Sequence, residues 1–347
     1  MGNNLVMAPN YLGLKGHNKE WKVFLAGPIQ GAEEWQFALP EIKNVIWLSP
    51  RRHDKELNDF NHSQQVKWET MALRMANIVL FWIPKEKEIV SSRSYAQTTR
   101  FELGENMARG KRIILGAYEG FSGRQYFEYK ASKYSNVIGG KVHSTLEECV
   151  EALKSYITEA ENEHKVYFTS DTHFSSDRAL KLSRRPFANV EEMDWTMIER
   201  WNNVVNPHDT IFHLGDFGEQ WPLPLLTGRK CFIEGNYERD GKTSISDEYK
   251  KYFFSYTKEP FKYSYTDKDG VTHEYIMGHE PSKVMKLSDD KVFGLFGHIH
   301  GRQRIKSFGI DVGVDCWNYT PVSLDDVQFY ENAVRKHLYD DEVWKTY

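Results

Sequence analysis

The sequence predicts an α/β protein with two domains, and three observations support this. Residues 22–165 alternate strand-like and helix-like segments, which favours a parallel sheet with helices on its faces. Residues 166–347 contain five apolar strand-like segments, each followed by a motif rich in histidine, aspartate or asparagine. The charged stretch 161–165 separates the two regions, and residues 1–21 precede them as an N-terminal extension. A chain of 347 residues is long enough to bury a core in each domain.

In the first region, apolar runs predict strands and the mixed segments between them predict helices. The expected strands are residues 22–26, 45–49, 78–83 and 112–117, and the expected helices are about 33–39, 65–76 and 98–109. The last helix of the region is the clearest. Residues 144–147 (Ser-Thr-Leu-Glu) have a capping-box pattern, and apolar side chains at positions 146, 150, 153 and 157 then line one helical face.

In the second region, the expected strands are residues 166–170, 210–214, 231–234, 275–277 and 292–296. The motifs that follow them are Asp171-Thr172-His173, Gly215-Asp216, Gly235-Asn236-Tyr237-Glu238, Gly278-His279 and Gly297-His298-Ile299-His300. Gly-Asp and Gly-Asn pairs are ordinary turn chemistry, but five such motifs at strand ends are hard to explain as turns. Nitrogen and oxygen donors in this number can hold two divalent transition metals. We therefore expect a hydrolase of phosphate esters that works through a metal pair.

The order and type of these motifs resemble the calcineurin-like metallophosphoesterase superfamily, over roughly residues 166–330. The resemblance implies an α/β fold with a β-sandwich flanked by helices. It also implies two divalent metal ions, for which neutral imidazoles and carboxylates favour manganese, iron or zinc. Asp216 would bridge the two ions. The resemblance gives one ion the ligands Asp171, His173 and His300, and the other ion Asn236, His279 and His298.

Tyr237 departs from this family, which usually has a histidine at that position to steady the phosphate and protonate the leaving oxygen. A phenol can donate a hydrogen bond, but it is a weaker acid than an imidazolium. We expect Tyr237 to be catalytic and to favour leaving groups that need little protonation; a metal site with slow turnover is the alternative. Arg184 and Arg185 are candidates for binding a substrate phosphate, because guanidinium forks match its oxygens, although surface arginines are often merely solvated.

Three clusters in the first region also carry information. A loop with Gly27, Pro28 and Gly31 follows the first strand, and glycine lets a ligand approach the backbone closely. Arg51 follows the second strand, and Glu102 lies early in a helix after the polar segment 91–99. Ligands in open α/β sheets bind outside the carboxyl ends of the strands. The glycine loop does not match the dinucleotide-binding fingerprint.

With Glu69 and the apolar run 78–82, these clusters resemble the nucleoside 2-deoxyribosyltransferase-like family over residues 22–155. The resemblance implies a Rossmann-like (flavodoxin-like) parallel sheet with helices on both faces. Glu102 would attack the anomeric carbon of the sugar, as the carboxylate nucleophile of a retaining glycosidase does, and Glu69 would be a second acid. The substrate contacts that it implies are Gly27, Pro28, Gly31, Arg51, Thr98 and Thr99.

Two features leave alternatives open in this region. An acid near the start of a helix is stabilised by the helix dipole, so Glu102 could have no catalytic role. Ala96 stands where typical transferases have an aspartate that protonates the base, which puts base exchange in more doubt than nucleotide binding.

Composition limits the partners and the setting. The net charge is −4 and no basic stripe dominates, so a stable nucleic-acid complex is not expected. Three cysteines without paired spacing fit reduced thiols. The N-terminus does not resemble a signal peptide, and the longest apolar run is too short to cross a membrane, so we expect a soluble cytoplasmic protein. The transferase-like relatives commonly build their sites between subunits, which makes a homo-oligomer plausible.

The sequence thus leads to two hypotheses. In the first, the chain is a bifunctional nucleotide-metabolising enzyme that cleaves or exchanges an N-glycosidic bond in one domain and hydrolyses a phosphate ester in the other. In the second, it is a metallophosphoesterase, acting as a phosphodiesterase or nuclease, with a non-catalytic nucleotide-sensing N-terminal domain. Base release that depends on Glu102 distinguishes them. In both, we expect a small nucleotide or nucleoside as the substrate, and for the second hypothesis short oligonucleotides and cyclic nucleotides also remain open.

Overall fold

The computed structural model describes residues 4–11, 13–52, 61–91, 94–258 and 260–336. The chain divides into two compact units, Met1–Glu163 and His164–Tyr347. Parts of the expected N-terminal extension and of the polar segment 91–99 lie outside the described residues. No helix in the described ranges is long and apolar enough to cross a membrane.

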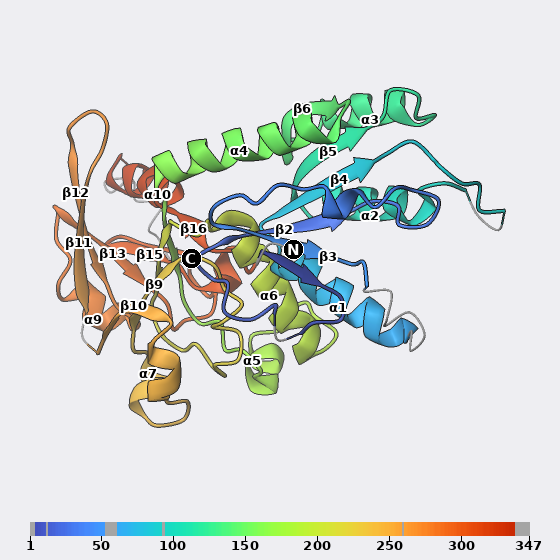
Figure 1. The fold of residues 1–347 in the computed structure, drawn as a ribbon. Coiled ribbons are helices and arrows are strands. Elements are labelled where there is room, and N and C mark those ends of the chain that lie inside the picture. Colours follow the sequence, from blue (N-terminus) through green and yellow to red (C-terminus); the bar gives the residue numbers. More distant parts are fainter. Residues whose placement is uncertain (1–3, 12, 53–60, 92–93, 259, 337–347) are drawn as a thin grey trace. The chain divides into compact units, whose positions relative to one another are not determined.

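The N-terminal unit is built on a parallel sheet, which has six strands among the described residues, in the order β1-β3-β2-β4-β5-β6 (Figure 1). Without the edge strand β1, this is the order of doubly wound, flavodoxin-like sheets. The strands are β1 (Leu5–Met7), β2 (Trp21–Ala26), β3 (Val45–Ser49), β4 (Ile78–Ile83), β5 (Arg112–Ala117) and β6 (Val137–His143). The predicted strands 45–49, 78–83 and 112–117 are confirmed residue for residue, because buried parallel strands are continuous apolar runs.

Helices cover both faces of this sheet. The long helix α4 (Leu146–Glu163) packs on β4, β5 and β6 and buries Cys149 and Leu153 against one face. On the opposite side, α1 (His62–Met75) contacts β2 and α2 (Gln97–Ala108) contacts β5 (Figure 1). A shorter helix, α3 (Arg124–Ala131), packs on β6. The predicted parallel sheet with helices on its faces is therefore confirmed.

The helix expected at residues 33–39 is wrong, because only a 3₁₀ turn, Trp35–Phe37, forms there. Pro40 disfavours the helical conformation at the residue before it, and so short a segment cannot recover the cost of helix nucleation. Packing fixes the segment instead, since Trp35 is buried and its indole N–H donates to the Pro28 carbonyl at 3.4 Å.

The capping box before α4 is present but lies one residue later than predicted. Thr145 Oγ1 accepts a hydrogen bond from the Glu148 backbone N–H at 3.1 Å. The Glu148 carboxylate accepts one from the Ser144 backbone N–H at 2.8 Å. The sequence pattern predicted Ser144 as the capping hydroxyl and Glu147 as the carboxylate. In the structure these roles belong to Thr145 and Glu148.

The C-terminal unit holds two mixed sheets, each five-stranded among the described residues. The first, in the order β10-β9-β8-β7-β16, comprises β7 (Val166–Thr169), β8 (Thr210–His213), β9 (Arg229–Ile233), β10 (Phe253–Thr257) and β16 (Val322–Ser323). The second, in the order β11-β12-β13-β15-β14, comprises β11 (Phe261–Thr266), β12 (Thr272–Met277), β13 (Val292–Phe296), β14 (Ile305–Lys306) and β15 (Gly309–Asp311). Strands β7–β10 run parallel to one another, as do β12, β13 and β15.

The two sheets share one hydrophobic core and so form a sandwich. Phe168 and Phe212 of the first sheet belong to the same buried cluster as Tyr275 and Leu295 of the second. The helices of this unit are α5 (Asp177–Leu182), α6 (Val190–Val204), α7 (Asn236–Arg239), α8 (Asp247–Lys250), α9 (Pro281–Met285) and α10 (Leu324–Lys336). Because parallel strands end at the same edge of a sheet, the loops after β7, β8, β9, β12 and β13 can meet at one place.

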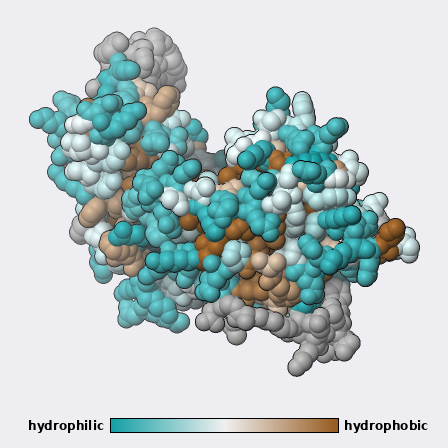
Figure 2. Space-filling view, turned by 45° about the horizontal axis from the view of Figure 1, so that its top comes forward, coloured by the Kyte–Doolittle hydropathy of each residue, from teal (hydrophilic) through white to brown (hydrophobic). Residues whose placement is uncertain are grey.

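Figure 2 shows a face on which hydrophilic residues predominate, with a patch of hydrophobic residues near the centre of the view. This distribution agrees with a sequence in which 27% of the residues are charged.

Candidate functional site

A cavity of about 550 Å³ lies at the carboxyl edge of the N-terminal sheet. Its walls come from the loops after β2, β3 and β4 and from helices α1 and α2. Strand order reverses between β2 and β4, and this switch point is where doubly wound sheets bind ligands. The volume lies within the range of small-molecule sites. The lining includes the predicted site residues Gly27, Pro28, Arg51, Glu69, Thr98, Thr99 and Glu102.

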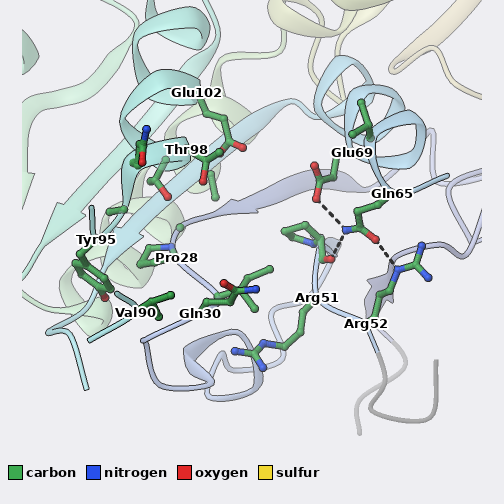
Figure 3. A pocket seen from close by; sticks show the side chains of 18 of the residues that line it. Pro28, Gln30, Arg51, Arg52, Gln65, Glu69, Val90, Tyr95, Thr98 and Glu102 are labelled. Atoms are coloured by element: carbon green, nitrogen blue, oxygen red, sulfur yellow. Dashed lines mark hydrogen bonds between the residues drawn. The ribbon is translucent and has the colours of Figure 1, made fainter. Parts of the chain in front are cut away.

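Glu102 of α2 and Glu69 of α1 point into this cavity from two sides (Figure 3). Burial, followed by the negative charges of Glu69 and Glu105, raises the pKa of Glu102 to about 7. Burial also raises the pKa of Glu69, although the hydrogen bond from Gln65 opposes this. Two carboxyl groups with raised pKa values in one cleft are typical of acid–base or nucleophilic sites.

Gln65 holds Glu69 in place. Its amide Nε2 donates to Glu69 Oε1 at 2.8 Å and to the Pro50 carbonyl at 2.6 Å, while its Oε1 accepts from Arg52 Nε at 2.6 Å (Figure 3). The loop after β3 is thereby tied to α1. Arg51 is also engaged, because it pairs with Glu34 at 2.8 Å.

The backbone of the loop after β2 has no room for a side chain at Gly27. A Cβ atom there would lie 2.2 Å from the Trp82 carbonyl oxygen and 2.8 Å from Trp35 Cζ2. Gly31, also predicted to bind substrate, is not among the cavity-lining residues. It has φ +74°, and its carbonyl accepts from the Lys87 N–H at 2.7 Å, so it forms the turn that shapes the loop.

The polar end of the cavity is formed by the start of α2. Thr98 and Thr99 lie in its first turn, preceded by Ala96 in the left-handed region (φ 56°). Backbone N–H groups in the first turn of a helix have no acceptor within the helix and attract anions. This end of the cavity is therefore suited to a phosphate or another negatively charged group.

In the C-terminal unit, the loops after five parallel strands bring the predicted metal ligands together. Asp171 follows β7, Asp216 follows β8, and Asn236 follows β9. His279 follows β12, and His298 and His300 follow β13 in the second sheet. Asp171, His173, Asp216, His298 and His300 all have positive φ, between 47° and 74°. Backbone strain of this kind clusters at functional sites, where the surrounding structure enforces it.

Two overlapping groups of side chains have the geometry of a metal site. The first is Asp171, His173 and His300; the second is Asp171, Asp216 and His279. In each, the potential ligand atoms lie within 4.8 Å of one another. His173 Nε2 is 3.9 Å from Asp171 Oδ1 and 3.5 Å from Asp216 Oδ2. Asp171 is common to both groups, and Asp216, a member of the second group, lies beside His173 of the first.

The remaining candidate ligands adjoin the second group. His279 Nε2 lies 3.4 Å from Asp216 Oδ2 and 2.9 Å from Asn236 Oδ1. His298 Nδ1 is 3.0 Å from the same Asn236 oxygen and 3.2 Å from His279 Nε2. The ring of His279 is anchored through Nδ1 to the Leu214 carbonyl at 2.8 Å. All seven predicted ligands therefore gather in one cluster.

The donor set fits divalent transition metals. Among the described residues, the buried Asp171 Oδ1 and His173 Nε2 have no hydrogen-bond partner, which is unusual for buried polar atoms unless they face an ion or water. Burial lowers the pKa of His173 to about 4, so its imidazole is neutral, as a ligand must be. Burial lowers the pKa of His279 too, but the Asp171 and Asp216 carboxylates outweigh it and raise the value to about 9. This cluster therefore has a negative potential that favours a cation.

Glu238 and two glycines allow the ligand loops to approach this closely. The Glu238 carboxylate accepts backbone hydrogen bonds from Gly235, Asp216 and Phe217 at 2.8–3.0 Å. A Cβ atom on Gly215, which has φ +95°, would lie 2.3 Å from the Gly235 nitrogen. Glycine before each ligand is therefore a packing requirement in these two motifs.

Tyr237 lies beside the cluster. Its ring meets the His173 ring edge-on at 4.9 Å, and its backbone N–H donates to Asp216 Oδ1 at 2.9 Å. Lys242 Nζ lies 4.8 Å from the centre of the same ring. The aromatic side chain thus borders the ligands, with a cation above it.

Arg185 is not available to bind a substrate phosphate, contrary to one of the sequence-based possibilities. It is buried, and its guanidinium donates to Asp315 at 2.9 and 3.0 Å and to the carbonyls of Thr172 and Asp171 at 2.8 and 2.6 Å, with Met193 Sδ at 3.6 Å. Each of its five N–H groups therefore has a partner. Arg184 is exposed (φ 51°) and remains a candidate.

Known proteins resemble parts of this chain. The uncharacterized protein MJ1445 of Methanocaldococcus jannaschii is 35% identical over 176 residues, which is 46% of this chain and 88% of the relative. The chain belongs to the same family as MJ1445. The gene 66 protein of Mycobacterium phage L5 is 27% identical over 206 residues, covering 51% of this chain and 96% of the relative.

Residues 20–121 match the model of the family described as nucleoside 2-deoxyribosyltransferase like. The chain therefore has an N-terminal nucleoside 2-deoxyribosyltransferase-like domain, and the cavity with Glu69 and Glu102 lies within it. A crystal structure of a protein of unknown function, AQ665 from Aquifex aeolicus, is 24% identical, with a TM-score of 0.37, over 48% of this chain and 99% of that one. At that TM-score the similarity supports no conclusion.

The sequence did not reveal the roles of two residues that support the candidate sites, Asp315 and Gln65. Asp315 lies in the closing segment 313–322, yet nothing local marks it as a partner of His300, to which it bonds at 2.9 Å. Gln65 is recognisable only as part of a motif, and its contacts with Pro50 and Arg52 are long-range. In both cases the sequence lacks the spacing signal that a local motif would give.

Proposed function

We propose that this chain is a bifunctional nucleotide-metabolising enzyme. The C-terminal unit would hydrolyse phosphate esters of nucleotides or related small molecules through two divalent metals. The N-terminal domain would cleave or exchange the N-glycosidic bond of a nucleoside or nucleotide. The observation that carries the first activity is the gathering of seven nitrogen- and oxygen-bearing side chains, four of them buried, from five loops in one cluster. The second rests on the two acids in the cavity and on the family match.

In the phosphoesterase site, imidazole and carboxylate donors suit manganese, iron or zinc better than calcium or magnesium. When bound, such a pair would supply Lewis-acid polarisation of the phosphoryl oxygens and of the attacking water. Asp216 would be shared between the two ions, with Asp171, His173 and His300 on one side and Asn236, His279 and His298 on the other. Tyr237, beside His173, would donate a hydrogen bond to a phosphoryl or leaving oxygen.

In the N-terminal site, ionised Glu102 would attack the anomeric carbon of the sugar. A carbon–oxygen bond would form as the carbon–nitrogen bond breaks, and the base would depart with the bonding electron pair and take up a proton from water; the later attack of water on the sugar would return a proton to the solvent. Water would then displace Glu102 and release the free sugar or sugar phosphate; a second base in its place would give transfer. The first turn of α2 would hold the substrate phosphate when one is present.

The phosphoesterase activity is tested with chelator-treated protein to which manganese is returned. We expect hydrolysis of aryl phosphate mono- or diesters that appears only with the metal and is lost in Asp216→Asn. Hydrolysis that persists in the chelator, or in that variant, would contradict a two-metal site. The matched control is Asp269→Asn, which replaces an exposed carboxylate between β11 and β12. This variant should hydrolyse the ester at the wild-type rate.

The glycosidic activity is tested by release of free base from nucleosides and nucleoside monophosphates. We expect release by the wild type and none by Glu102→Gln. Ala96, which replaces an aspartate of typical transferases, favours a second candidate, a nucleotide-sensing domain without catalysis. Nucleotide binding without base release would support that candidate and exclude glycosidic cleavage.

A further inference from the structure

We propose that Asp315 is a positioning residue that orients His300 toward the metal cluster, with Arg185 holding it in place. This inference rests on the proposed phosphoesterase function. Asp315 lies in a short 3₁₀ turn, Val314–Cys316, which follows β15 at the carboxyl edge of the second sheet. Neither it nor Arg185 is among the seven candidate ligands, so their role would be to support the ligands.

The His300 ring contacts Asp315 through one nitrogen and stacks on the ring of His173 at 5.1 Å. Its Nδ1 lies 2.9 Å from Asp315 Oδ2, and its Nε2 lies 3.9 Å from Asp171 Oδ1. A carboxylate accepts hydrogen bonds and does not donate, so Nδ1 carries the hydrogen in this pair. A neutral ring with hydrogen on Nδ1 keeps its lone pair on Nε2, which is the atom that faces Asp171. Carboxylates that fix metal-binding histidines in this way are a general feature of metal sites.

Arg185 connects this carboxylate to the first ligand loop. Its Nε and one terminal nitrogen bind the two oxygens of Asp315, at 2.9 and 3.0 Å. The terminal nitrogens also donate to the carbonyls of Asp171 and Thr172. The loop after β7 and the turn after β15 are thus joined through one buried ion pair. Because removing either partner leaves a buried charge unpaired, Arg185 is left intact in the test, and Asp315→Asn, which keeps the shape of the side chain, accompanies Asp315→Ala.

Asp315 uses both carboxylate oxygens, which sets it apart from an asparagine. Oδ1 accepts from Arg185 Nε, and Oδ2 accepts from both Arg185 and His300. An amide has one acceptor oxygen and would lose at least one of these bonds. His279, in contrast, is oriented by the backbone carbonyl of Leu214. Loss of the Asp315 carboxylate should therefore weaken the ion held by His300 and spare the ion held by His279.

The test is a calorimetric manganese titration of the full chain after chelator treatment. We expect two ions to bind the wild type. In Asp315→Ala, one ion should bind roughly 10- to 100-fold more weakly, with the other unchanged. Asp315→Asn should lie between the two. The exposed Asp325 on α10 offers the matched control, Asp325→Asn, which should bind both ions as the wild type does.

The outcomes separate this inference from the proposed function. If the wild type binds no manganese, or a single ion, the two-metal phosphoesterase itself is contradicted. If the wild type binds two ions and Asp315→Ala binds both with unchanged affinity, only the positioning role is overturned. Equal weakening of both ions in Asp315→Asn, with circular dichroism unchanged, would also overturn it, because Asp315 would then support the whole site. If Asp315→Ala does not fold, Asp315→Asn decides alone.

Discussion

His173 Nε2 lies 3.5 Å from Asp216 Oδ2, although the two residues follow different strands of the first sheet. The backbones of the two loops are also hydrogen-bonded, since the His173 N–H donates to the Asp216 carbonyl at 3.0 Å. Both residues adopt positive φ. These backbone conformations bring the His173 imidazole and the Asp216 carboxylate together at the place where we propose that two metals are held.

Asp216→Asn tests this arrangement by removing the proposed bridging charge. Supporting partners of metal ligands cost 10- to 100-fold when removed, so loss of a bridging ligand should lower phosphoester hydrolysis by at least about 100-fold. The variant should also bind less manganese, measured by elemental analysis after desalting. Full activity together with full metal content would rule out a bridging role.

The pH dependence of base release tests the state of Glu102. A nucleophile must be ionised, and the pKa of Glu102 is about 7, so the rate should rise with pH up to about 7 and then level off. Glu69 shares the cavity and also has a raised pKa, so the profile reports the pair. A rate that falls as the pH rises from 5 to 8 would exclude ionised Glu102 as the nucleophile.

The same group predicts a stability effect. The folded pKa of about 7 lies above the ordinary 4.5, so the folded state binds more protons between these values. Stability therefore falls as the pH rises through that window, and the penalty is complete above pH 7. Glu102→Gln removes the penalty. Its thermal midpoint, relative to the wild type, should be higher at pH 8 than at pH 5, and an equal difference at both pH values would contradict the raised pKa.

Tyr237→His introduces the histidine that the resemblance to metallophosphoesterases implies at this position. An imidazolium is a stronger acid than a phenol, so turnover of alkyl esters should rise relative to that of aryl esters. The structure places this side chain against His173, within reach of the proposed chemistry. The measurement is the ratio of the two turnover rates; if it does not move, Tyr237 has no part in leaving-group protonation.

Gly27→Ala tests the close approach in the N-terminal loop. The added methyl would lie 2.2 Å from the Trp82 carbonyl oxygen, and we expect a cost of about 1–3 kcal/mol with loss of nucleotide binding. Gly104→Ala is the matched control, because nothing lies within 4 Å of its Cβ position on α2. That substitution should stabilise the helix by about 0.5–1 kcal/mol. Denaturant titration measures both, and equal effects would contradict the steric argument.

The elements most readily predicted from the sequence were those with the strongest local signal. Strands β4 and β13 are continuous buried apolar runs, and their predicted bounds match the structure. The ligand motifs were recognisable because each joins a strand end to a donor residue. The contact between Arg185 and Asp315 was not, because it joins distant segments and depends on tertiary packing. The helix prediction for residues 33–39 was also wrong because of tertiary packing, since burial of Trp35 outweighs the helical pattern of the segment.

The measurement that tests the account most directly is a chromatographic product profile with nucleoside monophosphates and manganese. The wild type, Glu102→Gln and Asp216→Asn would each be incubated with the same panel, and free base, nucleoside and inorganic phosphate would be resolved. We predict both base and phosphate from the wild type, phosphate without base from Glu102→Gln, and base without phosphate from Asp216→Asn. Base that persists in Glu102→Gln, or phosphate that persists in Asp216→Asn, would contradict the two-site account.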